Sequence, residues 1–170
     1  NEQLSHEEIE ACLSLSLGAK RFLWLNSGYL AGDDTDSHVD TLARFCNENT
    51  IAYVQCSDEN DEHFHALYQM EQELKNFRTI EGNPYNLIPL PLPTPCYDDG
   101  ERLPATYANF LIMNNAVLVP IYCSETDEIA LRQLEKAFPD RDVVGIDCRV
   151  LIKQHGSLHC VTMQYPKGLF

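Results

Sequence analysis

The chain has 170 residues, of which 44% are apolar and 22% charged, so it can bury the core of one folded domain and is too apolar for a disordered protein. Its formal net charge of −14 argues against nucleic acid as a partner, because phosphate binding needs clustered lysines and arginines. No apolar run approaches the ~20 residues of a membrane span, which also excludes a membrane partner. Acidity suits a cationic substrate, although solubility alone is the more common explanation.

The seven cysteines contain no C-x-x-C pair. We therefore predict a reducing, cytoplasmic environment, with no disulfide framework, no zinc site and no cofactor. The first residues, Asn-Glu-Gln, show no signal-peptide pattern and look like the interior of a longer protein.

The first predicted element is a helix that follows Ser5 and ends at Gly18. Ser5 is a suitable N-cap, Glu8 stands at the capping-box position, and apolar residues then repeat at helical spacing. Residues 21–26 predict a short apolar strand. Residues 28–37 predict a loop rich in glycine and aspartate.

One pattern then occurs twice, as an apolar strand, an Asn-rich turn, a second strand, a helix and a third strand. The first copy covers residues 43–45, 51–54, 61–77 and 87–90, and the second covers 108–110, 117–122, 127–138 and 142–146. The acid or serine before each helix is expected to be its N-cap. Two β-β-α-β units offset by about 65 residues predict a modular α/β fold whose full form holds more copies.

Two further segments bear on this organisation. Residues 89–95 alternate prolines with apolar residues, which predicts a strand end running into a surface linker; a ligand for a proline-binding domain is a minor alternative. Residues 156–164 predict the opening strand of another unit, and neither end of the chain closes the pattern.

Two clusters far apart in the sequence are expected to meet in one site. His38 and Asp40 would face one side of an extended chain, because residues i and i+2 point alike. Cys160 follows the turn at Gly156, where a thiol can be exposed and an imidazolium or backbone dipole can lower its pKa. His159 alternates with Cys160 on the predicted strand, so we interpret it as structural. The alternatives are a surface His–Asp pair and a core cysteine.

Four blocks of the sequence resemble the agmatine deiminases, whose family includes the Porphyromonas-type peptidylarginine deiminases. They are residues 32–45, 103–110, 138–146 and the nucleophile block 156–162. Two positions depart from the usual pattern, since Ser37 and His155 stand where glycines are common. The resemblance covers nearly the whole chain, in the same order.

The resemblance implies the pentein fold, an α/β propeller of five β-β-α-β modules around a central site. Residues 1–170 would be the C-terminal part of one such catalytic domain, about half of the ring. The missing N-terminal half would be a required partner, because this chain lacks the family's other carboxylate blocks, and the isolated chain would be inactive or very weak. An open ring would also expose strand edges, which favours a homo-oligomer.

The resemblance further implies a reaction and the residues that perform it. Cys160 would attack the guanidinium carbon of agmatine, Asp40 would bind the guanidinium nitrogens, and His38 would act as acid and base. The substrate-binding residues would include Asp34, Asp36 and Asn109, with the choice among the loop aspartates open. Hydrolysis of a covalent thiouronium would yield N-carbamoylputrescine, a precursor of polyamines, and ammonia, without a metal or cofactor. The alternatives are peptidylarginine as substrate, a different cysteine–histidine hydrolase, or a non-catalytic binding module.

Overall fold

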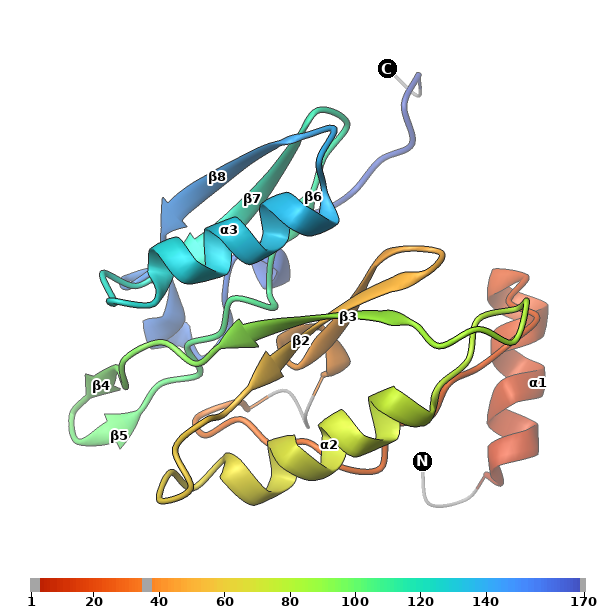
Figure 1. Cartoon of the computed structure of the whole chain (residues 1–170), viewed down its shortest axis with the longest axis horizontal. Coiled ribbons are helices and arrows are strands. Elements are labelled where there is room, and N and C mark those ends of the chain that lie inside the picture. Colours follow the sequence, from red (N-terminus) through yellow and green to blue (C-terminus); the bar gives the residue numbers. More distant parts are fainter. Residues whose placement is uncertain (1–3, 35–37, 169–170) are drawn as a thin grey trace.

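The computed structural model describes residues 4–34 and 38–168. Its main elements are two three-stranded sheets of the same topology (Figure 1). In the first sheet β1 (Ala43–Asn47) pairs antiparallel with β2 (Thr50–Gln55), and after helix α2 (Phe64–Asn76) strand β3 (Asn86–Pro91) pairs parallel with β2. In the second sheet β6 (Leu111–Ile112), β7 (Ala116–Ile121), α3 (Asp127–Ala137) and β8 (Asp142–Asp147) repeat this arrangement. The predicted α/β class and the element order of both units are confirmed.

The apolar core lies between the sheets and the two helices that cover them. Residues 51–54 of β2 are all buried, as expected for a central strand with a helix on one face and neighbours on both edges. Helix α2 buries Leu67, Met70 and Leu74, which share one helical face. Helix α3 packs against both β8 and β3, so it joins the second unit to the first.

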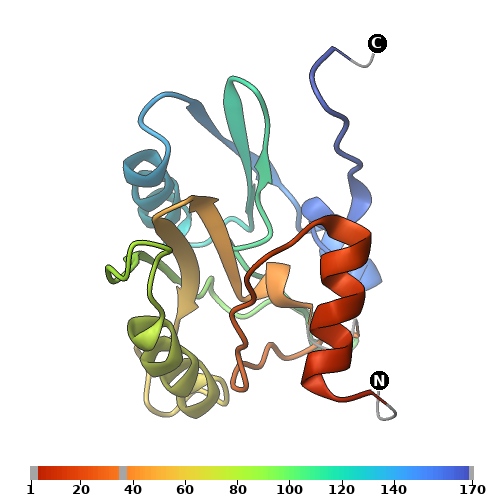
Figure 2. The same ribbon diagram turned by 90° about the vertical axis from the view of Figure 1, so that its right-hand side faces the viewer.

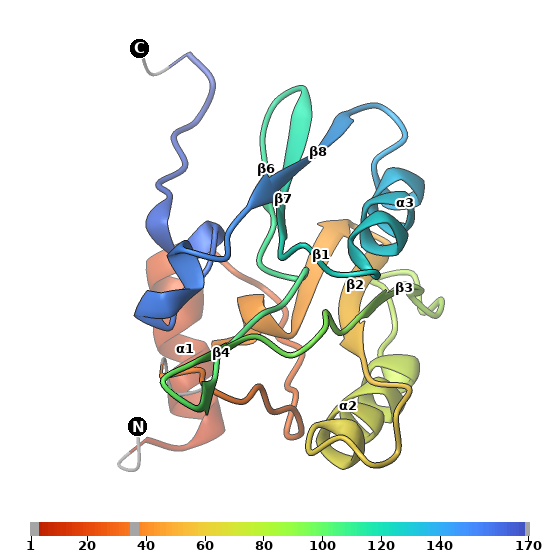
Figure 3. The ribbon, with the colours of Figure 1, turned by 90° about the vertical axis from the view of Figure 1, so that its left-hand side faces the viewer.

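Helix α1 (His6–Leu17) has the predicted caps but buries no residue. The Ser5 hydroxyl accepts the Glu8 N–H, the Glu8 carboxylate accepts the Ser5 N–H, and Gly18 adopts a φ of 70°. Trp24 attaches the helix, because its ring stacks on His6 and its N–H donates to Glu10 at 2.7 Å. Figures 2 and 3 show α1 on one side of the sheets, with α2 and α3 on the other.

Three predicted strands differ from the structure, either in position or in secondary structure. Residues 21–26 are extended but pair with no strand of the described chain; the Asn26 N–H donates instead to Glu73 of α2. The opening strand of the second unit begins at Leu111, three residues later than predicted. Residues 156–164 contain the 3₁₀ turn η3 (His159–Val161) and no strand. A strand needs a neighbour for its backbone N–H and C=O groups, and periodicity cannot reveal whether one is present.

The start of the first unit and the helix caps also differ from the prediction. His38 and Asp40 do not share an extended strand, because Val39–Thr41 form the 3₁₀ turn η1. The N-cap positions of α2 and α3 are His63 and Thr126, and neither side chain caps its helix.

The connections add short elements. β4 (Tyr97–Asp98) and β5 (Glu101–Arg102) pair antiparallel, and the 3₁₀ turn η2 (Leu151–Gln154) follows β8. None of the described helices has the length and apolarity needed to span a membrane.

A buried histidine fixes the loop that leads towards η1. His63 is 1% exposed, and its Nε2 accepts the Ala31 N–H at 2.9 Å, so Nδ1 carries the ring proton and donates to Asp61. Arg102 pairs with Asp61 at 3.0 Å. Gly32 has a φ of 78°, and a Cβ there would lie 2.2 Å from the carbonyl oxygen of Arg102. Burial opposes ionisation of Asp61, but the hydrogen bonds from Arg102 and His63 outweigh it and lower the pKa of Asp61 to about 2.

Asp61 therefore makes folding stability depend on pH. An aspartate in an unfolded chain has a pKa of about 4, so the contribution of Asp61 is full above that pH and is lost as the pH falls through about 2. Asp61→Asn should lower the free energy of unfolding at neutral pH and flatten its dependence on pH between about pH 5 and pH 2. Urea unfolding followed by circular dichroism measures both effects.

The matched control is Asp98→Asn, which removes the exposed ion pair with Lys153 and should change stability little. A pH dependence as steep in Asp61→Asn as in the unsubstituted chain would contradict the assignment.

Candidate active site

Four side chains from three separate segments form one hydrogen-bonded cluster. Asn109 is its centre and is 0% exposed. Its Oδ1 accepts the backbone N–H of His159 at 2.8 Å and the Cys160 thiol at 3.5 Å, and its Nδ2 donates to Asp40 Oδ2 at 3.0 Å. Asp40 Oδ2 also lies 2.7 Å from Nδ1 of His159. The cluster therefore joins η1, the segment before β6 and η3.

The two 3₁₀ turns that carry the cluster are built alike. In η1 the His38 carbonyl accepts both the N–H and the hydroxyl of Thr41, at 3.1 and 2.8 Å. In η3 the His159 carbonyl accepts the same two groups of Thr162, at 3.0 and 2.8 Å. In each turn the histidine carbonyl thus accepts two hydrogen bonds from the threonine, where the backbone of a 3₁₀ turn alone would supply one. The histidine–x–x–threonine spacing therefore closes both turns, with Asp40 two residues after the histidine of one and Cys160 one residue after the histidine of the other.

Three of the four side chains in the cluster are in part exposed to solvent. The side chains of His159 and Asp40 are 27% and 23% exposed, and Cys160 is exposed. Gly156 lies beneath the thiol, since a Cβ at that position would be 3.2 Å from the Cβ of Cys160. The carboxylate, the imidazole and the thiol of this cluster are therefore each in part accessible to solvent.

The cysteines differ in their surroundings. Burial raises the pKa of Cys46 and of Cys148 to about 11, which keeps these thiols protonated near neutral pH. Cys12, Cys123 and Cys160 are exposed. Of all seven, which lie within the described ranges, Cys160 is the one whose thiol contacts the cluster.

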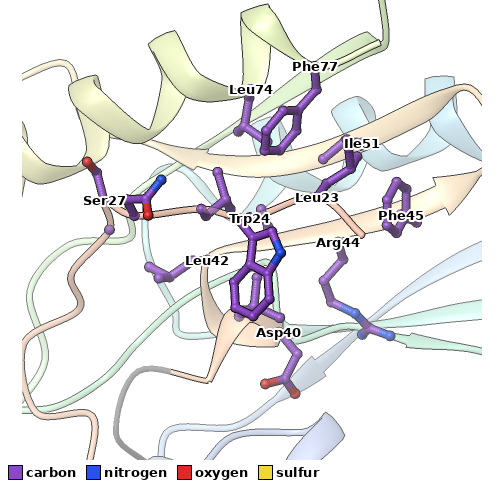
Figure 4. Close-up of a pocket in the computed structure, with 15 residues that line it drawn as sticks. Leu23, Trp24, Ser27, Asp40, Leu42, Arg44, Phe45, Ile51, Leu74 and Phe77 are labelled. Atoms are coloured by element: carbon purple, nitrogen blue, oxygen red, sulfur yellow. The ribbon is translucent and has the colours of Figure 1, made fainter. Parts of the chain in front are cut away.

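An apolar groove of about 810 Å³ opens beside Asp40. It runs between the segment 23–28 and the first sheet, and its apolar lining includes Leu23, Trp24, Leu42, Phe45, Ile51, Leu74 and Phe77. Figure 4 shows the Asp40 carboxylate below the indole of Trp24, at one end of this lining. Arg44 also borders the groove, but its guanidinium donates to the Phe110 carbonyl and lies 4.8 Å from the centre of that ring.

The predicted site residues are distributed unevenly around this cluster. Asp40 and Cys160, which are 120 positions apart in number, meet through Asn109, as the sequence led us to expect of the two loops. His38 is exposed at the N-cap position just before η1, and contact between its imidazole and Cys160 stays a prediction. Asp34 is exposed in the preceding loop, and Asp36 lies outside the described residues.

His159 is the residue that sequence reasoning missed. We interpreted it as structural because neighbours on a strand face opposite sides, but η3 is a turn and His159 binds Asp40. The usable signal was the threonine three residues after it, the same spacing as His38 and Thr41. Within the described ranges, no group of three or more histidine, cysteine or acidic side chains is placed to hold a metal ion.

Comparison with known proteins shows the family to which this chain is similar. The sequence profile of the Porphyromonas-type peptidyl-arginine deiminases matches residues 1–166. A Marinomonas protein named "Putative agmatine deiminase" is 34% identical over 98% of this chain and 50% of its own length. A crystal structure described as the "Putative Arginine Deiminase from Porphyromonas gingivalis" is 59% identical with a TM-score of 0.95, over 99% of this chain and 50% of that one.

The agmatine deiminase of Enterococcus faecalis is 31% identical with a TM-score of 0.90, over 98% of this chain and 50% of that one. This chain thus spans about half the length of the relatives it matches. With the profile covering almost every residue, the chain belongs to the Porphyromonas-type peptidyl-arginine deiminase family.

Proposed function

We propose that this chain is the C-terminal part of a pentein catalytic domain that hydrolyses guanidines, with agmatine as the substrate. The observation that carries the proposal is the cluster itself, in which Asp40, Asn109 and Cys160 are in contact although they are distant in sequence. The two units of identical topology and the half-length match to the family support a ring completed by an N-terminal half.

In the proposed reaction, Asp40 binds the guanidinium and Cys160 attacks it. A carboxylate matches the planar fork of guanidinium N–H groups, and a thiolate is nucleophilic enough for a carbon that carries three nitrogens. The sulfur–carbon bond forms, His38 protonates the departing nitrogen, and ammonia leaves. Water then adds to the thiouronium carbon while His38 takes its proton, and the sulfur–carbon bond breaks to release N-carbamoylputrescine and the thiolate.

The hydrogen bonds of the cluster suggest how Asp40 is prepared for this role. Its Oδ2 is engaged by Asn109 and by His159, so Oδ1 is the atom we assign to the guanidinium. His159 is then a positioning residue that holds the carboxylate. We propose the same kind of role for Asn109, in place of the substrate contact that the sequence led us to expect, because its side chain is 0% exposed and its hydrogen bonds join the two turns.

Peptidyl-arginine is the second candidate substrate. It is favoured by the family profile and by the groove, whose volume of about 810 Å³ exceeds what a four-carbon tail would fill. Asp40 and Cys160 would act in the same way on either substrate.

Cys160→Ala in a full-length protein containing this chain should abolish ammonia release from agmatine, because the nucleophile is removed. Coupled ammonia assays on agmatine and on a peptide with an internal arginine test the reaction and rank the two substrates. Cys12→Ala, at an exposed helical position, is the control and should retain activity. Turnover retained by Cys160→Ala would eliminate the proposal, and cleavage of amides without a guanidine would favour a different hydrolase.

The purified 170-residue chain should release ammonia from agmatine very weakly or not at all, since we expect further substrate-binding carboxylates in the N-terminal half. Mixing it with that half should restore turnover, measured by the same assay. Full activity of the 170-residue chain alone would show that its own residues complete the site.

Asn109→Asp tests the role of Asn109. The substitution puts a second carboxylate 3.0 Å from Asp40, and like charges at that distance raise a carboxyl pKa. A raised pKa in the folded state destabilises the fold increasingly as the pH rises above about 4. The variant should therefore lose more stability at about pH 8 than at about pH 5 in thermal denaturation. Asn109→Ala, which only removes hydrogen bonds, should lose the same amount at both values; equal losses in Asn109→Asp would contradict the contact.

A further inference from the structure

A second set of hydrogen bonds, entirely buried, connects the same two turns behind the cluster. Thr106 is 0%, Ser157 2% and Tyr122 4% exposed. Thr106 Oγ1 donates to the carbonyl of Thr41 at 2.8 Å, and Thr41 follows Asp40 in η1. Tyr122 approaches Ser157 with the two hydroxyl oxygens 2.9 Å apart, and Ser157 lies three residues before Cys160.

The protons in this chain of contacts can be assigned. The Tyr122 hydroxyl has one proton and donates it to the Thr106 carbonyl at 3.0 Å. The same oxygen accepts the Thr106 N–H at 3.2 Å, so the Ser157 hydroxyl must be the donor to Tyr122. The hydroxyl of Thr106 accepts the Ala108 N–H at 3.1 Å while it donates to Thr41. Each hydroxyl in this buried set therefore has a hydrogen-bond partner, and water does not compete for it.

We propose that Thr106 and Tyr122 are positioning residues that set the distance between the Asp40 turn and the Cys160 turn. The proposal rests on the function proposed above and deepens it. Thr106 binds the Asp40 turn through its hydroxyl, and Tyr122 binds the Cys160 turn through Ser157. Thr106 and Tyr122 are hydrogen-bonded to each other. Asn109 lies only three residues after Thr106, so the same segment carries both sets of hydrogen bonds between the turns.

The contacts in the cluster explain why this spacing matters. They lie between 2.7 and 3.5 Å, and a misplacement of about 1 Å can cost a catalysed reaction about 100-fold. Loss of either hydroxyl leaves buried carbonyl, amide or hydroxyl groups without partners, which the turns can relieve only by moving. The predicted effect is therefore a displaced Cys160 relative to Asp40, in a fold that remains intact.

The test compares Thr106→Val, which keeps the shape and removes the hydroxyl, with Thr106→Ser, which keeps the hydroxyl. In the 170-residue chain, iodoacetamide labelling of Cys160 is measured by peptide mass spectrometry relative to the exposed Cys12. Thr106→Val should raise this ratio about threefold, because the thiol is no longer held against Asn109. Thr106→Ser should restore the original ratio. Tyr122→Phe should act like Thr106→Val and carries the test if that variant fails to fold.

The kinetic arm uses the full-length protein. Thr106→Val and Tyr122→Phe should lower kcat about tenfold or more with a smaller change in KM, and Thr106→Ser should recover most of kcat. A fall in melting temperature with an unchanged labelling ratio and an unchanged kcat would overturn the inference, because the residues would then be structural only. A changed labelling ratio in a protein without any deiminase activity would uphold the positioning role and remove the proposed function.

Discussion

The buried amide of Asn109 is the interaction on which the rest of the site depends. An amide without exposure to water must find protein partners for its oxygen and its nitrogen, because leaving either unpaired costs about 1–3 kcal/mol. Here the partners are His159 and Cys160 on one turn and Asp40 on the other. Hydrogen bonds to the amide of this one side chain thus bring together two segments that are 120 positions apart in the sequence.

Hydrogen bonds from the surrounding fold hold the loops on either side of the site in place. The loop before η1 is held by His63 through Ala31, and by the His155 ring nitrogen, which lies 2.8 Å from the Gly32 carbonyl oxygen. His155 also precedes the Cys160 turn, so one histidine connects both loops. Helix α3 packs against strands of both sheets and so holds the two units together. The reactive side chains are therefore partly exposed groups on a buried frame, an arrangement common in enzymes whose chemistry lies in loops.

Much of the fold could be predicted because its signals are local. The Ser5–Glu8 box and Gly18 delimit α1 correctly, since caps depend on residues within one turn. Both helices of the repeated units and their flanking strands, apart from the misplaced opening strand of the second unit, follow from hydrophobic periodicity and Asn-rich turns. Asp40 and Cys160 could be named as candidates from the sequence, because each stands in a block that resembles the deiminase family and beside a loop or glycine turn.

Local sequence patterns identify the α-helices, the repeated units and the reactive groups that the chain carries. The remaining features depend on contacts between distant segments. Residues 21–26 and 156–164 have strand composition but no strand neighbour in the described chain, so their backbone groups bind side chains or close a 3₁₀ turn. His159 could be recognised as the partner of Asp40 only once that turn replaced the predicted alternation. The physical reason is that a helix satisfies its own backbone, whereas a strand, a buried amide and a site between loops are completed by residues far away in sequence.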